Sequence, residues 1–454
     1  MENLKRRLEG KALSVMLLTI FLDVLGVGIM LPVMPQLVYQ IFVPQGYSFN
    51  HGLIVLGWLT AIYPLMQFLA TPILGQLSDR YGRKPILGFS LLGTAVGYVI
   101  FAIAILTRNI PLLFIGRAID GVTGGNISVA RAVIADISPP EHRSRNFGAI
   151  GAAFGIGFVM GPYIGARLAI HNSSVFGLFN TPNWFSSATP FWFAAILSLL
   201  NTGLMLIILP ETHKHINHGL KVAWNKSLHN ISKAATLPGL RTIFTAEFLF
   251  WGGFTFFTTF IQIVLIQKLH FRINNVGDYF AYIGLCIIFA QIVVVPIVAK
   301  LFKGHQILRF SLIGSGITLF LQLFSRNTSE LMVAVPFVAT FISLTVANSS
   351  ALVSLSADNE VQGEVLGIEA SVQALAQTVP AIISGYVAVM GVNMPIIVGG
   401  LTMIASGLVF IVFYHVPKKV TYEEELNPLK RSGLKVIKYV IIVIAAIRGS
   451  KLRG

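Results

Sequence analysis

Long apolar runs follow one another along almost the whole of this sequence, and they constrain its fold more than any other feature. Twelve runs of about twenty residues occur, at 12–34, 53–75, 86–106, 111–136, 148–170, 190–209, 242–265, 277–299, 307–325, 330–355, 365–390 and 395–416. As a helix, a run of this length crosses roughly 30 Å of hydrocarbon and satisfies its own backbone hydrogen bonds in lipid. Charged residues make up only 11% of the chain, against about 25% in soluble domains. The sequence therefore predicts an all-α polytopic membrane protein.

Membrane topology explains the net charge of +15. With twelve spans and a cytoplasmic N-terminus, most of the 33 lysines and arginines fall in cytoplasmic segments, as the positive-inside rule describes. Only a few lie near the outer face, among them Arg108, Lys268, Arg272 and Arg326. We therefore expect both termini in the cytoplasm, the lipid bilayer as the surrounding partner, and no nucleic-acid partner.

The chain divides into two halves that resemble each other, which is the signature of an internal repeat. Ile86–Gly93 (ILGFSLLG) recurs in the second half as Ile307–Gly314 (ILRFSLIG). We predict an N-terminal six-helix bundle at 1–209, a cytoplasmic linker loop at 210–241, a C-terminal six-helix bundle at 242–416 and a cytoplasmic tail at 417–454. The apolar stretch 434–447 of the tail is basic at both flanks and short for a span, so it fits an interfacial helix better than a thirteenth span.

A charged turn joins the second and third runs, with the sequence Gly75-Gln-Leu-Ser-Asp79-Arg80-Tyr-Gly82-Arg83-Lys84-Pro85. Gly82 permits a backbone turn that a side chain would block. Arg83 and Lys84 resist crossing the bilayer and hold this loop on the cytoplasmic side.

This turn resembles the loop between helices 2 and 3 of the major facilitator superfamily, whose pattern is G-x-L-x-D-R-x-G-R-K. Segments of the first, fourth and fifth runs are similar, in order and spacing, to the tetracycline exporters and other twelve-helix drug/proton antiporters; they are Leu22–Pro35, Gly116–Gly125 and Gly151–Gly165. The resemblance covers residues 12–416 and is most specific in the first half. It implies the major facilitator fold, with two pseudo-symmetric six-helix bundles and substrate held between them near the midplane.

The resemblance also implies a gating role for the loop residues Gly75, Asp79, Arg80, Gly82 and Arg83, together with Asp136 at the end of the fourth run. Asp79 would cap the N-terminus of the eleventh helix, where the helix dipole favours a carboxylate. Arg83 would pair with Asp136. Both contacts would form only while the cytoplasmic side is closed. A purely topological role for the loop is the alternative.

Four ionisable residues lie inside the apolar runs: Asp23, Arg117, Asp120 and Glu247. Such residues are costly in a membrane unless paired or wetted, and they commonly mark a substrate or ion pathway. We predict that Asp23 exchanges protons and that Arg117, which shares a helix face with Asp120, sets its proton affinity. A static ion pair is the alternative for Arg117. Glu369, about a turn into the eleventh run, fits a helix-terminal role equally well.

The fifth run carries glycines four residues apart, in the pattern Gly157-x-x-x-Gly161-Pro162-x-x-Gly165. Small residues at this spacing let a neighbouring helix approach closely, and Pro162 removes a backbone hydrogen bond. The pattern resembles a motif of exporters rather than importers, although Ala166 replaces the family's next glycine. Helix packing without any bearing on transport direction is the alternative.

These features together predict a secondary active transporter that exports a small organic compound, drug-like or a metabolite, in exchange for protons by alternating access. A proton-coupled importer of a nutrient or siderophore-type metabolite is the alternative. A non-transporting scaffold is disfavoured because it gains nothing from costly buried charges. We expect a monomer in a bacterial inner membrane, with a small-molecule substrate and protons as its partners.

Several absences narrow the function further. Without a nucleotide-binding signature, we expect no enzymatic activity and no cofactor, with the proton gradient as the driving force. A metal site from His213, His215 and His218 is less favoured than a solvated loop, and Cys286, the single cysteine, forms no internal disulfide. The ninth-helix acid and eighth-helix histidine of the tetracycline exporters are missing at 314–316 and 288–290, which counts against tetracycline as the substrate.

Overall fold

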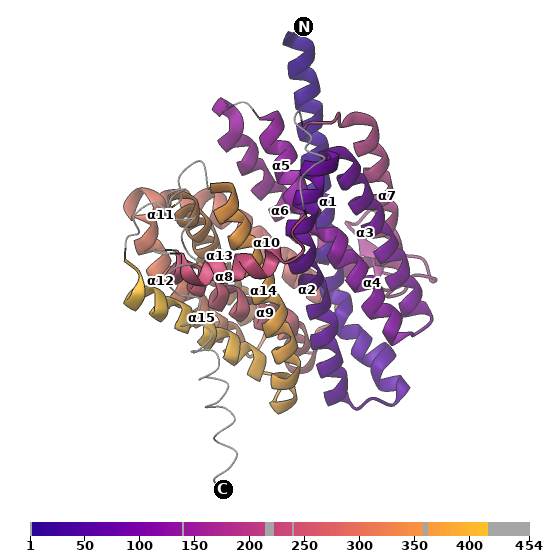
Figure 1. Ribbon diagram of the computed structural model, residues 1–454. Coiled ribbons are helices and arrows are strands. Elements are labelled where there is room, and N and C mark those ends of the chain that lie inside the picture. Colours follow the sequence, from indigo (N-terminus) through magenta and orange to yellow (C-terminus); the bar gives the residue numbers. More distant parts are fainter. Residues whose placement is uncertain (1, 139, 214–221, 238–239, 357–361, 416–454) are drawn as a thin grey trace.

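A computed structural model describes residues 2–138, 140–213, 222–237, 240–356 and 362–415 (Figure 1). The chain forms two groups of helices that lie side by side, with the earlier helices on the right of the view and the later ones on the left. The first group comprises α1 (Glu2–Leu37), α2 (Phe49–Tyr81), α3 (Arg83–Leu106), α4 (Ile110–Thr123), α5 (Ile127–Ile137), α6 (Pro140–Leu168) and α7 (Thr189–Ile208). The second group comprises α9 (Arg241–Leu269), α10 (Ile273–Phe289), α11 (Val295–Leu301), α12 (Gly304–Phe324), α13 (Thr328–Leu355), α14 (Gln362–Met390) and α15 (Met394–Phe413).

Short elements complete the fold. The π-helices η1 (Val38–Phe42) and η4 (Ala290–Val294) extend α1 and join α10 to α11, while the 3-10 helices are η2 (Val43–Gln45) and η3 (Gly124–Asn126). A two-stranded antiparallel hairpin, β1 (Ser174–Val175) and β2 (Phe179–Asn180), lies between α6 and α7. Helix α8 (Lys226–Thr236) lies in the segment that joins the two groups.

The apolar runs become membrane-length helices, with one exception. Within the described ranges, eleven helices are long and apolar enough to span a membrane. The exception is the predicted run 111–136, which divides into α4 and α5 at η3. A Cβ on Gly125 would lie 3.0 Å from the backbone of Thr71, and one on Gly124 would lie 2.6 Å from the Tyr63 hydroxyl. The glycine pair therefore lets α2 approach at the break, and the fold is that of a multi-pass integral membrane protein.

The turn at Gly82 has the conformation that its sequence requires. Gly82 has a φ of 100°, where a side chain would be strained. It ends α2 and directly precedes the first residue of α3. We call the end of the molecule with this turn the Gly82 face and the other end the opposite face.

Helix α6 packs closely against α1 through the predicted glycines. A Cβ on Gly157, Gly161 or Gly165 would lie 2.8, 2.6 or 2.4 Å from a backbone carbonyl oxygen of α1. Pro162 lies inside α6, beside Gly28. On its other side α6 meets α10 of the second half, where Gly277 makes room for Ala166. Ala166, which stands where the exporter pattern has a further glycine, is thus accommodated by Gly277 of the other half.

The two halves meet on the opposite face through contacts between α2 and α14 and between α6 and α10. Gly385 of α14 lies against the backbone of α2 near Gly57, and the Trp58 indole N–H donates to the Tyr386 hydroxyl at 3.3 Å. Arg167 of α6 pairs with Asp278 of α10 at 2.6 Å. These contacts bring the two halves together at the ends of the helices farthest from Gly82.

The predicted linker loop contains a helix where we expected only a polar loop. The hydroxyl of Ser227 in α8 donates to the Phe68 carbonyl of α2 at 2.7 Å. Asn230 of α8 donates to the Ser371 hydroxyl of α14 at 3.0 Å. Buried Ala234 and Leu237 give the helix an apolar face. Helix α8 therefore bridges α2 and α14, whereas His215, His218 and the tail at 417–454 lie outside the described residues.

The α1–α6 contact yields a stability prediction. Gly161→Ala places a methyl group against the backbone of Leu25 and Gly28, which cannot swing aside as a side chain can. We expect a loss of about 1–3 kcal/mol of stability from overpacking, seen as a lower thermal unfolding midpoint of the purified protein.

Gly203→Ala is the matched control, because a Cβ on Gly203 in α7 meets nothing within 4 Å. That substitution should leave the midpoint unchanged or raise it slightly, as alanine favours helix over glycine. Equal thermal midpoints for the two variants would contradict this prediction, because they would show that the α1–α6 contact accommodates an added methyl group.

Candidate functional site

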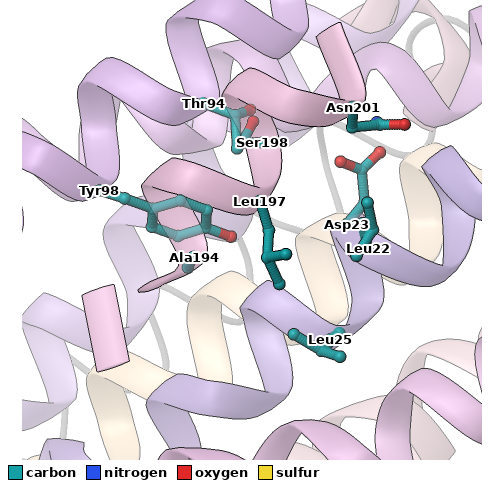
Figure 2. Close-up of a pocket in the computed structure, with 9 residues that line it drawn as sticks. All are labelled: Leu22, Asp23, Leu25, Thr94, Tyr98, Ala194, Leu197, Ser198 and Asn201. Atoms are coloured by element: carbon teal, nitrogen blue, oxygen red, sulfur yellow. The ribbon is translucent and has the colours of Figure 1, made fainter. Parts of the chain in front are cut away.

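Asp23 lies inside α1 and faces a small cavity between α1, α3 and α7 (Figure 2). The side chain is half-buried, and its Oδ2 atom is enclosed without a hydrogen-bond partner among the described residues. The cavity has about the smallest volume that admits one water molecule. Its lining consists of Leu22, Asp23, Leu25, Thr94, Tyr98, Ala194, Leu197, Ser198 and Asn201.

Asn201 of α7 is a further polar residue of this cavity, and its position could not be predicted from the sequence. Figure 2 shows its side chain on the side of the cavity where the Asp23 carboxyl lies. Its Oδ1 accepts from the Thr19 hydroxyl at 3.2 Å, but its Nδ2 has no partner within the described part of the chain. Buried polar groups are normally hydrogen-bonded, so an unpaired donor and an unpaired acceptor here fit a bridging water or an exchanging proton.

Tyr98 closes the cavity from α3. A Cβ on Gly26 would lie 2.0 Å from the Tyr98 hydroxyl oxygen, so Gly26 is what allows this ring to reach α1. Drug-sized ligands need a pocket of about 300–1,000 Å³, which far exceeds this cavity. The Asp23 cavity therefore suits a proton or a water molecule and is too small for an organic substrate.

Arg117 and Asp120 form a buried ion pair on α4. Their side chains are joined at 3.0 Å, with only 5% and 3% of the two residues exposed. The Arg117 guanidinium also lies over the Tyr63 ring, 4.4 Å from its centroid. The predicted influence of Arg117 on the proton affinity of Asp23 stays a prediction, because the guanidinium pairs with Asp120. With Asp120 neutralised by Arg117, Asp23 is the ionisable group of this cluster without a counter-ion.

Glu247 lies in the other half of the molecule, on α9. It is 3% exposed, and its Oε1 accepts from the Ser349 hydroxyl of α13. Glu369 of α14 is also buried, and its Oε1 accepts from the Ser350 hydroxyl at 2.7 Å. The structure thus places Glu247 in a cluster separate from Asp23, and it places Glu369 in the bundle interior with side-chain donors.

The loop residues converge on Arg83 at the Gly82 face. Its guanidinium bonds to Asp79 at 2.6 Å, to Ser78 at 2.6 Å and to Asp136 at 3.3 Å. The pairing of Arg83 with Asp136 is therefore present, while the segment 357–361 that precedes α14 lies outside the described residues, so the Asp79 cap stays a prediction.

The pair between Arg83 and Asp136 lies within the first half. Its link to closure of the cytoplasmic side stays a prediction. Since both residues belong to the first half, the pair needs no contact between the halves. The other loop residues stay near α2: Gly75 lies beside Ser128 of α5, and the Arg80 guanidinium lies over the Tyr81 ring.

Glu211 caps α3 at this loop, which nothing in the sequence indicated because it lies 128 residues from Arg83. Its carboxylate accepts from the backbone N–H groups of Arg83 and Lys84 at 2.9 and 3.1 Å, and from that of His213 at 2.9 Å. Burial raises the pKa of this carboxyl, but the backbone hydrogen bonds outweigh it and hold the pKa below its usual value. A Cβ on Gly82 would lie 2.5 Å from Oε2, so this contact also requires the glycine.

Metal ligands are not gathered anywhere in the described ranges, where no group of three or more His, Cys, Asp or Glu side chains could hold an ion. His213 is described but His215 and His218 are not, so the predicted preference for a solvated loop at these histidines stays a prediction.

The helices and the buried charges define a polytopic membrane protein of the transporter class. The chain belongs to the Major Facilitator Superfamily, whose sequence profile matches residues 16–320 and 243–449. Members of this superfamily are transporters.

Several relatives are tetracycline resistance proteins. The class H protein of Pasteurella multocida is 33% identical over 293 residues, which are 63% of this chain and 66% of that protein. The class C protein of Escherichia coli is 39% identical over 206 residues, which are 45% of this chain and 46% of that protein. The chain thus matches between about half and two thirds of the length of these curated relatives.

Solved structures share the fold. The human organic anion transporter MFSD10 (TETRAN) has a TM-score of 0.66 at 21% identity, covering 88% of this chain and 99% of that chain. A D-xylose-proton symporter has a TM-score of 0.70 at 16% identity, covering 90% and 99%. At these identities the likeness establishes the fold alone.

The Glu211 cap yields a stability prediction with a defined pH dependence. Glu211→Gln removes the negative charge at the N-terminus of α3, which should cost about 0.5–2 kcal/mol. Because folding lowers the pKa of Glu211, the native advantage is fully present above the usual glutamate value of about 4.3. It is lost as the pH falls through the lower folded-state pKa.

Thermal unfolding of both proteins between neutral and acidic pH measures this difference. His213→Ala is the control, because His213 contributes only its backbone N–H to the contact. A gap between native protein and Glu211→Gln that widens on acidification would contradict the assignment.

Proposed function

We propose that this protein is a proton-coupled exporter of small, drug-like organic compounds that works by alternating access. The observation that carries the proposal is the Asp23 site, where Asp23 and Asn201 line a water-sized cavity and the Asp23 Oδ2 and Asn201 Nδ2 atoms have no hydrogen-bond partner among the described residues. Protons are the coupling ions that such a site suits, and no further cofactor is invoked.

The energetic argument rests on the charge state of Asp23. An unpaired carboxylate in a membrane span costs several kcal/mol, and protonation removes that cost. Uptake of a proton from one side and its release to the other can therefore be tied to the conformational change of the protein. The neighbouring ion pair of Arg117 and Asp120 is already compensated at 3.0 Å, so it is less suited to exchange.

Export is favoured over import by two observations. The relatives described above are tetracycline resistance proteins, of which the class C protein is 39% identical over its matched region. The glycines Gly157, Gly161 and Gly165 have the spacing of the exporter pattern and press α6 onto α1. We propose that the substrate binds between the halves near the midplane and that it is a drug-like compound other than tetracycline, since the histidine and the acid of the tetracycline exporters are missing at 288–290 and 314–316.

A proton-coupled importer is the second candidate, supported by the shared fold with a D-xylose-proton symporter. Both candidates place the Gly82 face in the cytoplasm, because Arg83 and Lys84 lie there. We further propose a monomer in a bacterial inner membrane.

Vesicles distinguish these possibilities and test Asp23. We expect a panel of tetracycline, ethidium and other amphiphilic cations to yield at least one compound whose addition to inside-out membrane vesicles with an acidic lumen releases protons. Asp23→Asn should abolish this release, because the amide cannot exchange a proton, whereas Asp23→Glu should retain part of it. Fluorescence of a pH-sensitive dye in the lumen reports the result, and detergent gel filtration confirms that each variant is folded.

Unchanged proton release by Asp23→Asn would refute the role of this carboxyl. Compound accumulation driven only by an acidic external medium would instead establish the importer.

A further inference from the structure

Two buried carboxyls of the second half are bound by adjacent serines of α13. They belong to Glu247 of α9 and Glu369 of α14, which are 3% and 5% exposed and accept from Ser349 and Ser350. This arrangement differs from the Asp23 cavity and from the ion pair of Arg117 and Asp120, because it brings two acids together.

The hydrogen bonds around this pair leave one position for a proton. Ser349 donates to Oε1 of Glu247, and Ser350 and Gln373 donate to Oε1 of Glu369 at 2.7 and 3.4 Å. Oε2 of Glu247 receives no donor from the described residues. Two ionised carboxylates repel at this range, whereas one shared proton lets the first carboxyl donate to the second.

The surroundings supply little other charge. Helix α15 contributes Ser406, which donates to the Ala246 carbonyl, and α8 contributes Asn230, which bonds to Ser371; neither side chain titrates. Among the described residues, the charged group that acts on Glu369 apart from Glu247 is Arg131.

We propose that Glu247 and Glu369 together bind one exchangeable proton, in a site distinct from Asp23. Loss of the proton to water leaves two carboxylates, which repel each other in the interior of the bundle. Binding of the proton removes this repulsion. The use of this step during transport rests on the proposed function, but the proton site itself does not.

Infrared difference spectroscopy tests the site without any substrate. The purified protein in lipid nanodiscs is titrated with pH, and the carbonyl stretch of protonated carboxyls is followed. The titration uses an Asp23→Asn background, so that failure of the Asp23 assignment leaves this test intact. We expect one pH-dependent carboxyl signal to remain in that background.

The two glutamates should then respond differently to substitution. With Glu247→Gln, Glu369 keeps the Ser350 and Gln373 donors and should stay ionised, so the signal is lost. With Glu369→Gln, Glu247 is buried beside an uncharged side chain and should keep its proton throughout, so the signal becomes pH-independent. A titrating signal that persists in both variants would overturn the proposal.

Discussion

The cost of an ionised side chain inside a membrane is the constraint on which the rest of this structure depends. Each charge in the spans either has a partner or lies where a proton can neutralise it. Arg117 and Asp120 satisfy each other at 3.0 Å, and Glu247 and Glu369 accept from Ser349 and Ser350. Asp23 faces a water-sized space that Asn201 also lines, and no charged group pairs with it among the described residues. The contrast between compensated and uncompensated carboxyls is what makes Asp23 the proposed coupling site.

Close helix packing holds these charges in place. The glycines of α6 bring its backbone against α1, the helix that carries Asp23. Gly26 makes room for the Tyr98 ring, which lines the same cavity as Asp23. Because α6 also packs against α10 of the second half, a movement of one half relative to the other would change the packing of α6 against α1. The packing of small residues thus links the proton site to the boundary between the halves.

The sequence predicted the fold class and the polar residues inside the spans, because both follow from local composition. Apolar runs of spanning length can be read directly, and a charge within such a run is conspicuous. The break between α4 and α5 could not be predicted in the same way, because a pair of glycines such as Gly124 and Gly125 also occurs in unbroken helices. The helix α8 was missed because its pattern is mostly polar.

Contacts between residues far apart in the chain could not be predicted from the sequence, because they depend on how the helices pack. The contact of Glu211 with the N-terminus of α3 joins residues far apart in the chain, and the position of Asn201 beside Asp23 depends on how α7 packs against α1. The pairing of Arg83 with Asp136 was predicted from a family resemblance and is present, whereas its role in gating stays a prediction.

Carbodiimide labelling tests the central claim most directly, because the reagent modifies protonated carboxyls within membranes. The native protein in lipid would be labelled over a range of pH, and the modified residues located by peptide mass spectrometry. Our account predicts that Asp23 is labelled near neutral pH and protected as the pH rises, whereas Asp120, ionised beside Arg117, is not labelled. Labelling of Asp120 with Asp23 unmodified, or labelling of Asp23 that does not change with pH, would contradict it.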